Sequence, residues 1–166
     1  MTIALAALGS VAAAIVEFTI LPYLRLGGVQ PHLVFVLAVL WTVLGSVEGG
    51  LTVAFVGGLT VDVLAPRPLG STAFTLLVVA GSATAFTALF PRARYIGPIV
   101  AVFILSVLHS VMSLLVFGAL TRPVPVADPV MVFLPGAIAD TVLAALIVPV
   151  VVAVRDRRAA EERFEW

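Results

Sequence analysis

The sequence predicts an all-α integral membrane protein, a single bundle of about six transmembrane helices that takes up residues 1–166. The first reason is composition: the chain is 62% hydrophobic and 11% charged, with a mean hydropathy of +1.24, whereas soluble domains carry about 25% charged residues. The second is pattern, because apolar runs bounded by proline, glycine or charge fill nearly the whole chain. The longest polar stretch is residues 155–166.

A spanning helix needs about 20 mostly apolar residues, because the hydrocarbon core is about 30 Å thick and each residue rises about 1.5 Å. The first apolar run predicts a helix at 3–21, and without a preceding basic segment it is interpreted as an uncleaved span. Pro31 precedes a shorter helix at 33–47, and Glu-Gly-Gly at 48–50 separates it from one at 49–64. This pair is expected to be a tight transmembrane hairpin, then, in order of preference, partly crossing helices or one bent element.

The second half of the chain predicts three longer helices at 72–90, 96–120 and 130–154, followed by a polar cytoplasmic tail at 155–166. Orientation follows from arginine, since short cytoplasmic loops carry the excess of basic residues. With six spans and both termini inside, six of the nine basic residues lie on the inner side. The inner set is Arg92, Arg94, Arg155, Arg157, Arg158 and Arg163, and the outer set is Arg25, Arg67 and Arg122.

Composition also excludes several functions. Nine basic residues balance nine acidic ones, so no net field attracts nucleic acid. The chain has no cysteine, and His32 and His109 lack the spacing of a zinc site. No nucleophile motif or Gly-rich phosphate loop is present. We therefore expect no enzyme activity, no metal and no cofactor, and we expect membrane lipid to surround the protein.

Small residues mark a packing face on the helix expected at 49–64. Gly50, Ala54 and Gly58 recur every four positions, and Gly57 lies beside them. Lipid supplies no hydrophobic force between helices, so small residues that let backbones approach are the usual means of close packing. This face is the candidate protein-interaction surface.

Four ionisable residues fall inside the predicted spans, namely Glu17, Asp62, His109 and Asp140. A charge at the bilayer centre is costly, so such residues are expected to pair within the protein. With both termini inside, all four lie in the outer half of the membrane. We expect His109 and Asp140 to form a hydrogen bond across their helices, and Glu17 and Asp62 to reach the outer interface or cap a neighbouring loop.

Two interpretations of this cluster remain open: a buried polar network that fixes helix register, which we favour, and a substrate or proton site. A related pattern occurs in the helix at 96–120, where Ser106, His109, Ser110 and Ser113 form one polar stripe. That stripe is expected to face protein. Its serines can bond to their own helix carbonyls, so a helix interface is favoured over a hydrophilic pathway.

One stretch is specific enough to suggest a family. Residues 57–70 read Gly-Gly-Leu-Thr-Val-Asp-Val-Leu-Ala-Pro-Arg-Pro-Leu-Gly, and they resemble the most recognisable segment of the rod shape-determining protein MreD family. There a Gly-rich helix ends in an aspartate and is followed by a short loop with the motif seen here as Pro68, Leu69 and Gly70. The chain departs from the family at His32, where an acidic or amide residue is frequent, and at Asp140, where asparagine is frequent.

The resemblance implies a place in the bacterial inner membrane as a subunit of the cell-elongation complex, or elongasome. It implies a protein that binds MreC and works with MreB, the glycosyltransferase RodA and a class B penicillin-binding protein to guide peptidoglycan synthesis. It also implies a fold like the substrate-binding S components of energy-coupling factor vitamin transporters.

Two functional hypotheses follow from these observations. The leading one is a non-enzymatic scaffold that receives the transmembrane helix of MreC, with loops 65–71 and 121–129 available on the outer side. The rival is a substrate-binding membrane subunit of a small-molecule, vitamin-type transporter with a pocket near the four ionisable residues. An intramembrane enzyme has little support, because a nucleophile and base pair is not found in the sequence.

Overall fold

The computed structural model describes residues 2–23, 29–89, 95–120 and 129–164. The elements in chain order are α1 (Thr2–Thr19), η1 (Leu21–Tyr23), α2 (Leu33–Leu40), η2 (Trp41–Gly45), α3 (Val47–Thr52), η3 (Val53–Gly57), α4 (Gly58–Leu64), α5 (Ser71–Leu89), α6 (Ile96–Leu120) and α7 (Pro129–Phe164). Segment η2 continues α2, and η3 joins α3 to α4, as π-helical turns within longer helices. The expectation of an all-helical membrane protein agrees with these elements.

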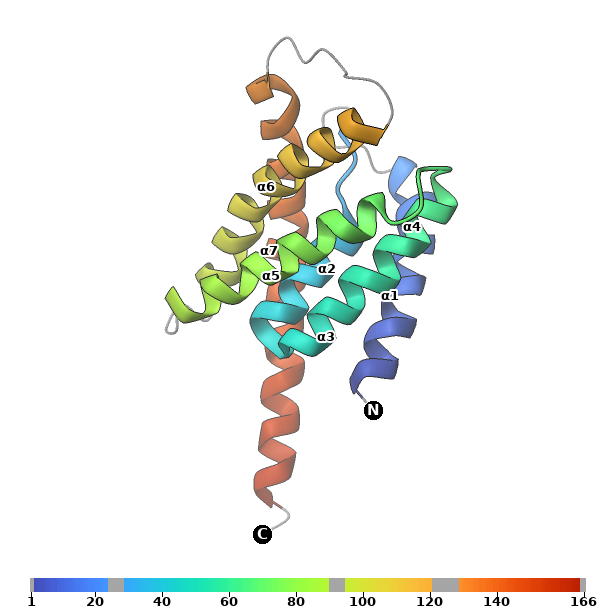
Figure 1. The fold of residues 1–166 in the computed structure, drawn as a ribbon. Coiled ribbons are helices and arrows are strands. Elements are labelled where there is room, and N and C mark those ends of the chain that lie inside the picture. The colour runs from blue at the N-terminus through green and yellow to red at the C-terminus, as the bar shows by residue number, and fades with distance from the viewer. Residues whose placement is uncertain (1, 24–28, 90–94, 121–128, 165–166) are drawn as a thin grey trace.

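The helices run alternately up and down, and the two marked chain ends lie at the same end of the bundle (Figure 1). Within the described residues, four helices are long and apolar enough to cross a membrane: Ile3–Tyr23, Val47–Leu64, Ile96–Leu120 and Phe133–Val154. Two further apolar helices, Leu33–Gly45 and Ser71–Phe86, are shorter. A bundle of about six complete spans therefore stays a prediction.

The hairpin between α2 and α3 turns at Ser46, not at residues 48–50 as expected. Ser46 has an extended backbone (φ −137°, ψ 148°), and its hydroxyl accepts a hydrogen bond from the backbone N–H of Gly49 at 3.2 Å. A serine in this position caps the first turn of the helix that follows. The two glycines expected in the turn are instead buried inside α3, where they pack on Trp41 and Thr42.

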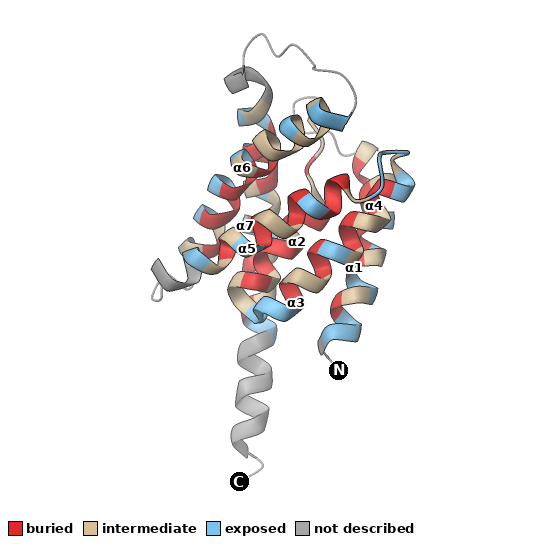
Figure 2. Cartoon of the chain, in the orientation of Figure 1, coloured by how far each residue is buried: buried red, intermediate tan, exposed pale blue. Residues whose placement is uncertain are grey.

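Helix α2 forms the centre of the bundle. Its buried side chains are Val34, Phe35, Val36, Ala38, Val39 and Leu40, and it contacts α1, α5, α6 and α7. On the surrounding helices, the buried residues likewise lie on the sides that face the interior of the bundle (Figure 2). A helix that is apolar on all sides is one that other helices cover, which explains why so short an element is so completely buried.

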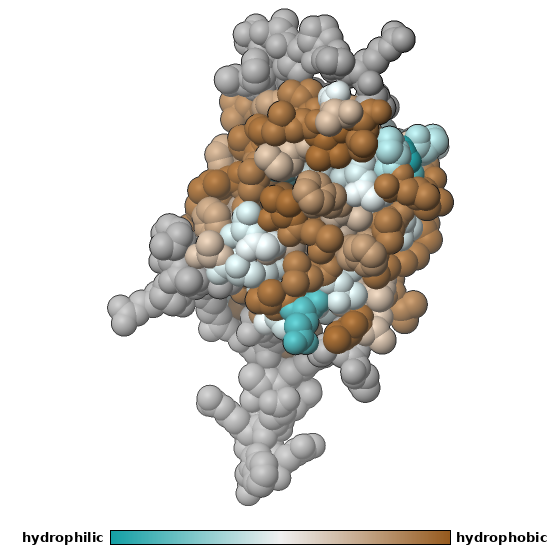
Figure 3. Space-filling view, viewed as in Figure 1, coloured by the Kyte–Doolittle hydropathy of each residue, from teal (hydrophilic) through white to brown (hydrophobic). Residues whose placement is uncertain are grey.

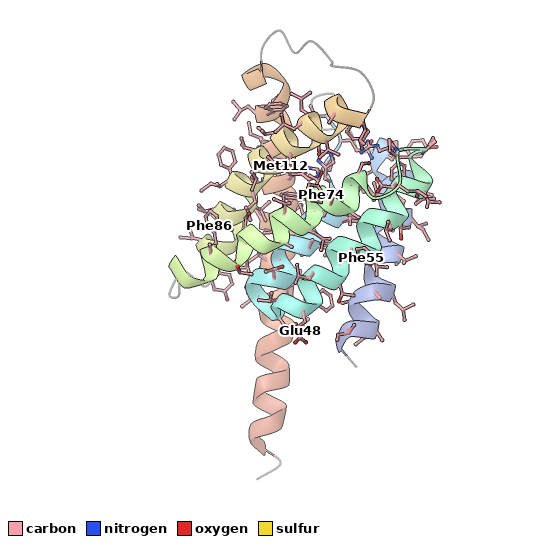
Figure 4. All side chains as sticks on the ribbon, viewed as in Figure 1. Glu48, Phe55, Phe74, Phe86 and Met112 are labelled. Carbon is pink, nitrogen blue, oxygen red and sulfur yellow. The ribbon has the colours of Figure 1, made fainter. Side chains whose placement is uncertain are left out.

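The face of the bundle seen in Figure 3 is largely apolar, as the predominance of brown shows. Phe55 of η3 and Phe74 of α5, both labelled in Figure 4, are 50% and 57% exposed. Lipid tails are the solvent that suits such side chains. The exposed apolar surface and the spanning helices together make this an integral membrane protein.

Helix α7 is longer than the sequence predicts. We expected a helix at 130–154 and then a tail, but the helix continues to Phe164 and projects beyond the bundle (Figure 1). At about 1.5 Å per residue, its 36 residues extend about 54 Å, more than the thickness of a hydrocarbon core. The added turns consist of the polar residues that follow Val154.

Candidate functional site: buried carboxylates at two helix starts

Asp62 caps the N-terminus of α5. One carboxylate oxygen accepts a hydrogen bond from the backbone N–H of Gly70 at 2.8 Å, and the other accepts one from the Thr72 N–H at 3.0 Å and one from the Ser71 hydroxyl at 3.2 Å. These N–H groups have no partner within the helix, and a negative charge is favoured there. Asp62 is 1% exposed, so a buried carboxylate and a helix start satisfy one another.

The loop motif makes this cap possible. The Ser71 N–H donates to the Pro68 carbonyl at 3.1 Å, which closes a turn around Leu69. Gly70 follows with φ +90°, a backbone conformation that side chains with a Cβ rarely adopt. The turn directs the Gly70 N–H at Asp62, while Leu69 is 74% exposed. Pro68, Leu69 and Gly70 thus connect the carboxylate on α4 to the helix it caps.

Glu17 supplies a cap to a different helix. It lies near the end of α1, and its carboxylate accepts a hydrogen bond from the backbone N–H of Val34 at 2.9 Å. Its own backbone carbonyl accepts a second bond, from the side-chain amide of Gln30, at 2.9 Å. Both bonds bind the chain just before and at the start of α2. Glu17 is 6% exposed, so it caps a neighbouring segment rather than reaching a solvent interface.

Asp140 on α7 holds the same helix start from the opposite side. Its carboxylate accepts a hydrogen bond from the His32 backbone N–H at 2.7 Å and lies 3.4 Å from the His32 ring nitrogen Nδ1. The Ser106 hydroxyl of α6 donates a third bond at 2.5 Å. Asp140 is fully buried. One carboxylate therefore joins α6, α7 and the start of α2.

The expected hydrogen bond between His109 and Asp140 is not among the contacts of the described residues. The reason is register, because Ser106, one turn earlier on α6, takes the place opposite Asp140. The His109 ring instead packs against the Phe35 ring at 4.9 Å and meets the His32 ring edge-on at 5.3 Å between centroids. His109 is thus a core imidazole, 7% exposed, beside the Asp140 site.

The pKa of His32, which lies just before α2, is changed by the groups around it. Partial burial lowers the pKa of its imidazole, but its hydrogen bond to Asp140 and the negative charges of Asp140 and Glu17 outweigh that effect. The pKa of His32 is therefore raised above its ordinary value. The positive charge of Arg67 opposes the rise.

The small-residue face of α3, η3 and α4 packs inside the chain. A Cβ at Gly58 would lie 2.5 Å from the backbone Cα of Ala73 on α5, and one at Gly57 would lie 2.6 Å from the Val34 side chain. Gly50 packs on Thr42, and Ala54 is fully buried. The face is a packing surface that the chain's own helices cover, and docking of a partner there stays a prediction.

A small pocket lies between the two capped helix starts. It is lined by Glu17, Phe18, His32, Val34, Phe35, Val61, Arg67, Thr72, Leu76 and His109, and its cavity volume is about 30 Å³. Asp62 and Asp140 are not among its lining residues, although Asp62 bonds to Thr72 and Asp140 to His32. Small-molecule sites typically have volumes of about 300–1,000 Å³. This pocket is therefore not large enough for a vitamin.

The sequence does not predict several of the site residues. It predicts no contact for His32, although His32 follows Pro31 at a helix start, which is where capping contacts occur. Ser106 belonged to the polar stripe and marked the correct side of α6. No sequence signal brings Arg67 or Thr72 to the pocket, because that contact depends on how α4 packs against α1 and α5, and how α5 packs against α6.

Fold and site define a helical membrane protein whose intramembrane carboxylates cap the starts of its own helices. Among the described residues, no three His, Asp or Glu side chains are placed so that together they could hold a metal ion. The family model of rod shape-determining protein MreD matches residues 2–155, nearly the whole chain. The chain therefore belongs to the MreD family, a family of rod shape determination. Comparisons with curated proteins and with solved structures found no match, so the likeness to transporter S components stays a prediction.

Proposed function

We propose that this protein is a non-enzymatic membrane subunit of the bacterial elongasome that binds MreC and helps to position peptidoglycan synthesis, so that the cell keeps its rod shape. The observation that carries the proposal is the family match over residues 2–155. RodA, the class B penicillin-binding protein and MreB are further partners, bound directly or through MreC. The site of action is the cytoplasmic membrane, with both termini in the cytoplasm.

The chemistry of the buried carboxylates supports a structural role. Glu17, Asp62 and Asp140 each accept hydrogen bonds from backbone N–H groups of helix starts. Asp62 and Asp140 each accept three or more hydrogen bonds, so most of their lone pairs are engaged and are less available for action as a nucleophile or general base. The same contacts favour the buried polar network over the substrate or proton site.

The outward faces of the bundle are the candidate docking surface for MreC, because α5 and α2 pack on the small-residue face. Exposed apolar side chains on different helices mark these faces. They are Leu8 on α1, Phe55 on η3, Phe74 on α5, Val107 on α6 and Leu146 on α7. Of the two loops expected to be available, 65–71 carries the Asp62 cap, and 121–128 lies outside the described residues.

Photocrosslinking can test binding and locate its face. A photoreactive phenylalanine is placed singly at Leu8, Phe55, Phe74, Val107 and Leu146, and in a control at Val79, which is fully buried. We expect crosslinks to MreC in living cells from one helix or two adjacent helices and none from Val79. Capture of MreC from no outward position would contradict direct binding.

A genetic test addresses the role itself. Depletion of the protein should convert rods to spheres, and the wild-type chain should restore rod shape. Purification from detergent-solubilised membranes, followed by mass spectrometry, should recover a partner with one transmembrane helix and a periplasmic coiled coil. Recovery of a stoichiometric vitamin, with rod shape retained after depletion, would instead support the transporter.

A further inference from the structure

The pocket between the starts of α2 and α5 contains an unusual concentration of polar side chains. Five elements contribute them: Glu17 comes from α1, His32 precedes α2, Arg67 lies in the loop after α4, Thr72 begins α5 and His109 lies on α6. Apolar side chains form the rest of the wall, including Phe35 and Leu76, each 1% exposed. The pocket is therefore a polar space inside an apolar bundle.

The Thr72 hydroxyl is a buried group without a partner. Thr72 is 8% exposed, and its Oγ1 has no hydrogen bond to any of the described residues. Other buried hydroxyls of the same region are satisfied: Thr75 donates to the Ser71 carbonyl, and Ser71 donates to Asp62. Buried polar atoms in proteins are nearly always hydrogen-bonded to protein or to ordered water. The Thr72 hydroxyl thus requires a partner, and the pocket that Thr72 lines is where one fits.

The size of the pocket selects the class of partner. A buried water needs about 10–15 Å³ of such volume, so a cavity of about 30 Å³ holds about two waters. The lining also carries groups of both signs, since Glu17 and Arg67 both contribute to it. A metal ion is disfavoured by that arginine, and a larger organic ligand does not fit.

We propose that this pocket is a water-binding site, in which an ordered water hydrogen-bonds to Thr72 Oγ1 and to other polar groups of the wall. A buried water typically makes about three hydrogen bonds, and the lining offers a carboxylate, a guanidinium and two imidazoles. Asp62 fixes the backbone of Thr72 from one side, and Asp140 fixes His32 from the other. Water in the pocket joins these two capped helix starts into one hydrogen-bonded unit.

Radiolytic hydroxyl labelling with mass spectrometry tests the site in the wild-type protein in nanodiscs. A short X-ray pulse forms hydroxyl radicals from bound water, and these oxidise side chains beside it. Leu76 and Leu105 are a matched pair, since each is 1% exposed but only Leu76 lines the pocket. We expect Leu76 to be labelled several-fold more than Leu105. Equal labelling of the two leucines would overturn the proposal.

A substitution gives an independent test through the sign of a stability change. Thr72→Val keeps the shape of the side chain and removes the hydroxyl. If water bonds to Oγ1, the variant loses that bond and its Tm falls by about 3 °C. If the hydroxyl is unsatisfied, its removal raises the Tm. In Thr72→Ser, which keeps the hydroxyl, Leu76 should be labelled to the same extent as in the wild type.

Two further outcomes separate water from other occupants. Native mass spectrometry of the protein released from nanodiscs should show the mass of the chain alone. A bound ion or small molecule that is lost in Thr72→Val would overturn the assignment to water. If Thr72→Val does not fold, the comparison of Leu76 with Leu105 in the wild type still decides the question.

Discussion

Buried carboxylates in this bundle are placed where backbone N–H groups are in excess. Asp62 serves the start of α5, while Glu17 and Asp140 serve the start of α2 from two sides. In a bilayer, water does not satisfy the free N–H groups of a helix start, and a carboxylate within the span is costly when unpaired. The carboxylate satisfies the N–H groups and the N–H groups stabilise the carboxylate, which explains the three intramembrane carboxylates in so apolar a chain.

Asp62→Asn tests the cap at the start of α5. The amide replaces one acceptor oxygen by an NH₂ group, which then faces N–H donors of Gly70 or Thr72. We expect the free energy of unfolding to fall by about 1–3 kcal/mol, measured as a lower Tm in detergent. Glu48→Gln is the control, because Glu48 is exposed at the first turn of α3 and should change the Tm little. Equal effects would contradict a specific cap.

The contact of His32 with Asp140 predicts a pH dependence. Because the pKa of His32 is raised in the folded protein, its stabilising effect is fully present below the unfolded pKa of about 6.5 and is lost as the pH rises through the folded pKa. The charged neighbours Asp140, Glu17 and Arg67, and the ring of His109, also face it. We expect the Tm difference between wild type and His32→Gln to shrink from pH 6 to pH 9, measured in detergent. A constant difference would contradict the prediction.

His32 and Asp140 are the two positions at which we expected the chain to depart from the family pattern, and they contact one another. This contact joins the start of α2 to α7.

At the scale of elements, the central hairpin depends on close approach. The continuous helix of α3, η3 and α4 packs its small residues on α2, α1 and α5. Both arms of the hairpin contain a π-helical turn, η2 and η3. Such turns rotate the residues that follow relative to a regular α-helix. Which residue of α4 faces Ala73 of α5 therefore depends on the course of the whole helix formed by α3, η3 and α4.

Gly58→Ala and Gly81→Ala form a matched pair that tests this packing. The new Cβ at position 58 meets the Ala73 backbone at 2.5 Å, whereas at position 81 it meets nothing within 4 Å. We expect Gly58→Ala to lower the stability by about 1–3 kcal/mol and Gly81→Ala to be neutral or slightly stabilising, since alanine favours helix. Thermal unfolding in detergent measures both. Similar Tm values for the two variants would contradict the contact between α4 and α5.

Because Gly58 is an internal contact, a bulky residue there is a poor test of MreC binding. Loss of co-purification with Gly58→Leu would report a disturbed bundle. Substitutions on exposed faces, such as those at Phe55 or Leu146, leave the core intact and report docking. Variants at buried helix contacts therefore test the fold, whereas variants on exposed helix faces test partner binding.

At the scale of the whole molecule, the arrangement makes a topology prediction. The α4–α5 loop lies at the end of the bundle opposite the two termini, and Glu48 lies at the same end as the termini (Figures 1 and 4). With the termini inside, Leu69 is extracytoplasmic and Glu48 is cytoplasmic. The chain contains no cysteine, so single-cysteine variants report one position each.

We expect a membrane-impermeant maleimide to label Leu69→Cys in intact cells or spheroplasts. Glu48→Cys should be labelled only after the membrane is permeabilised. Leu69 is 74% exposed, so access of the reagent does not depend on unfolding. Labelling of Glu48→Cys alone in intact cells would reverse the orientation that the arginine distribution predicts.

The sequence by itself determined the membrane environment, the helical class, the range 96–120 and the family, because hydropathy and the segment at 57–70 are local properties of the chain. For Asp62 and Glu17 it left two alternatives open, contact with the outer interface or capping of a neighbouring loop. The groups that bond to Asp62 lie 8–10 residues after it, and Val34 lies 17 residues after Glu17. Each carboxylate therefore bonds to a segment close to it in the sequence.

Only the tertiary structure decided the contacts between distant elements. The bond from His32 to Asp140 joins residues 108 positions apart, and the choice of Ser106 over His109 depends on the rotation of α6 against α7. The burial of Gly58 beneath α5 and the pocket around Thr72 follow from the same packing. The sequence shows which polar groups in the membrane need hydrogen-bond partners. The packing of the helices decides which partner each group has, because several different pairings would satisfy the same donors and acceptors.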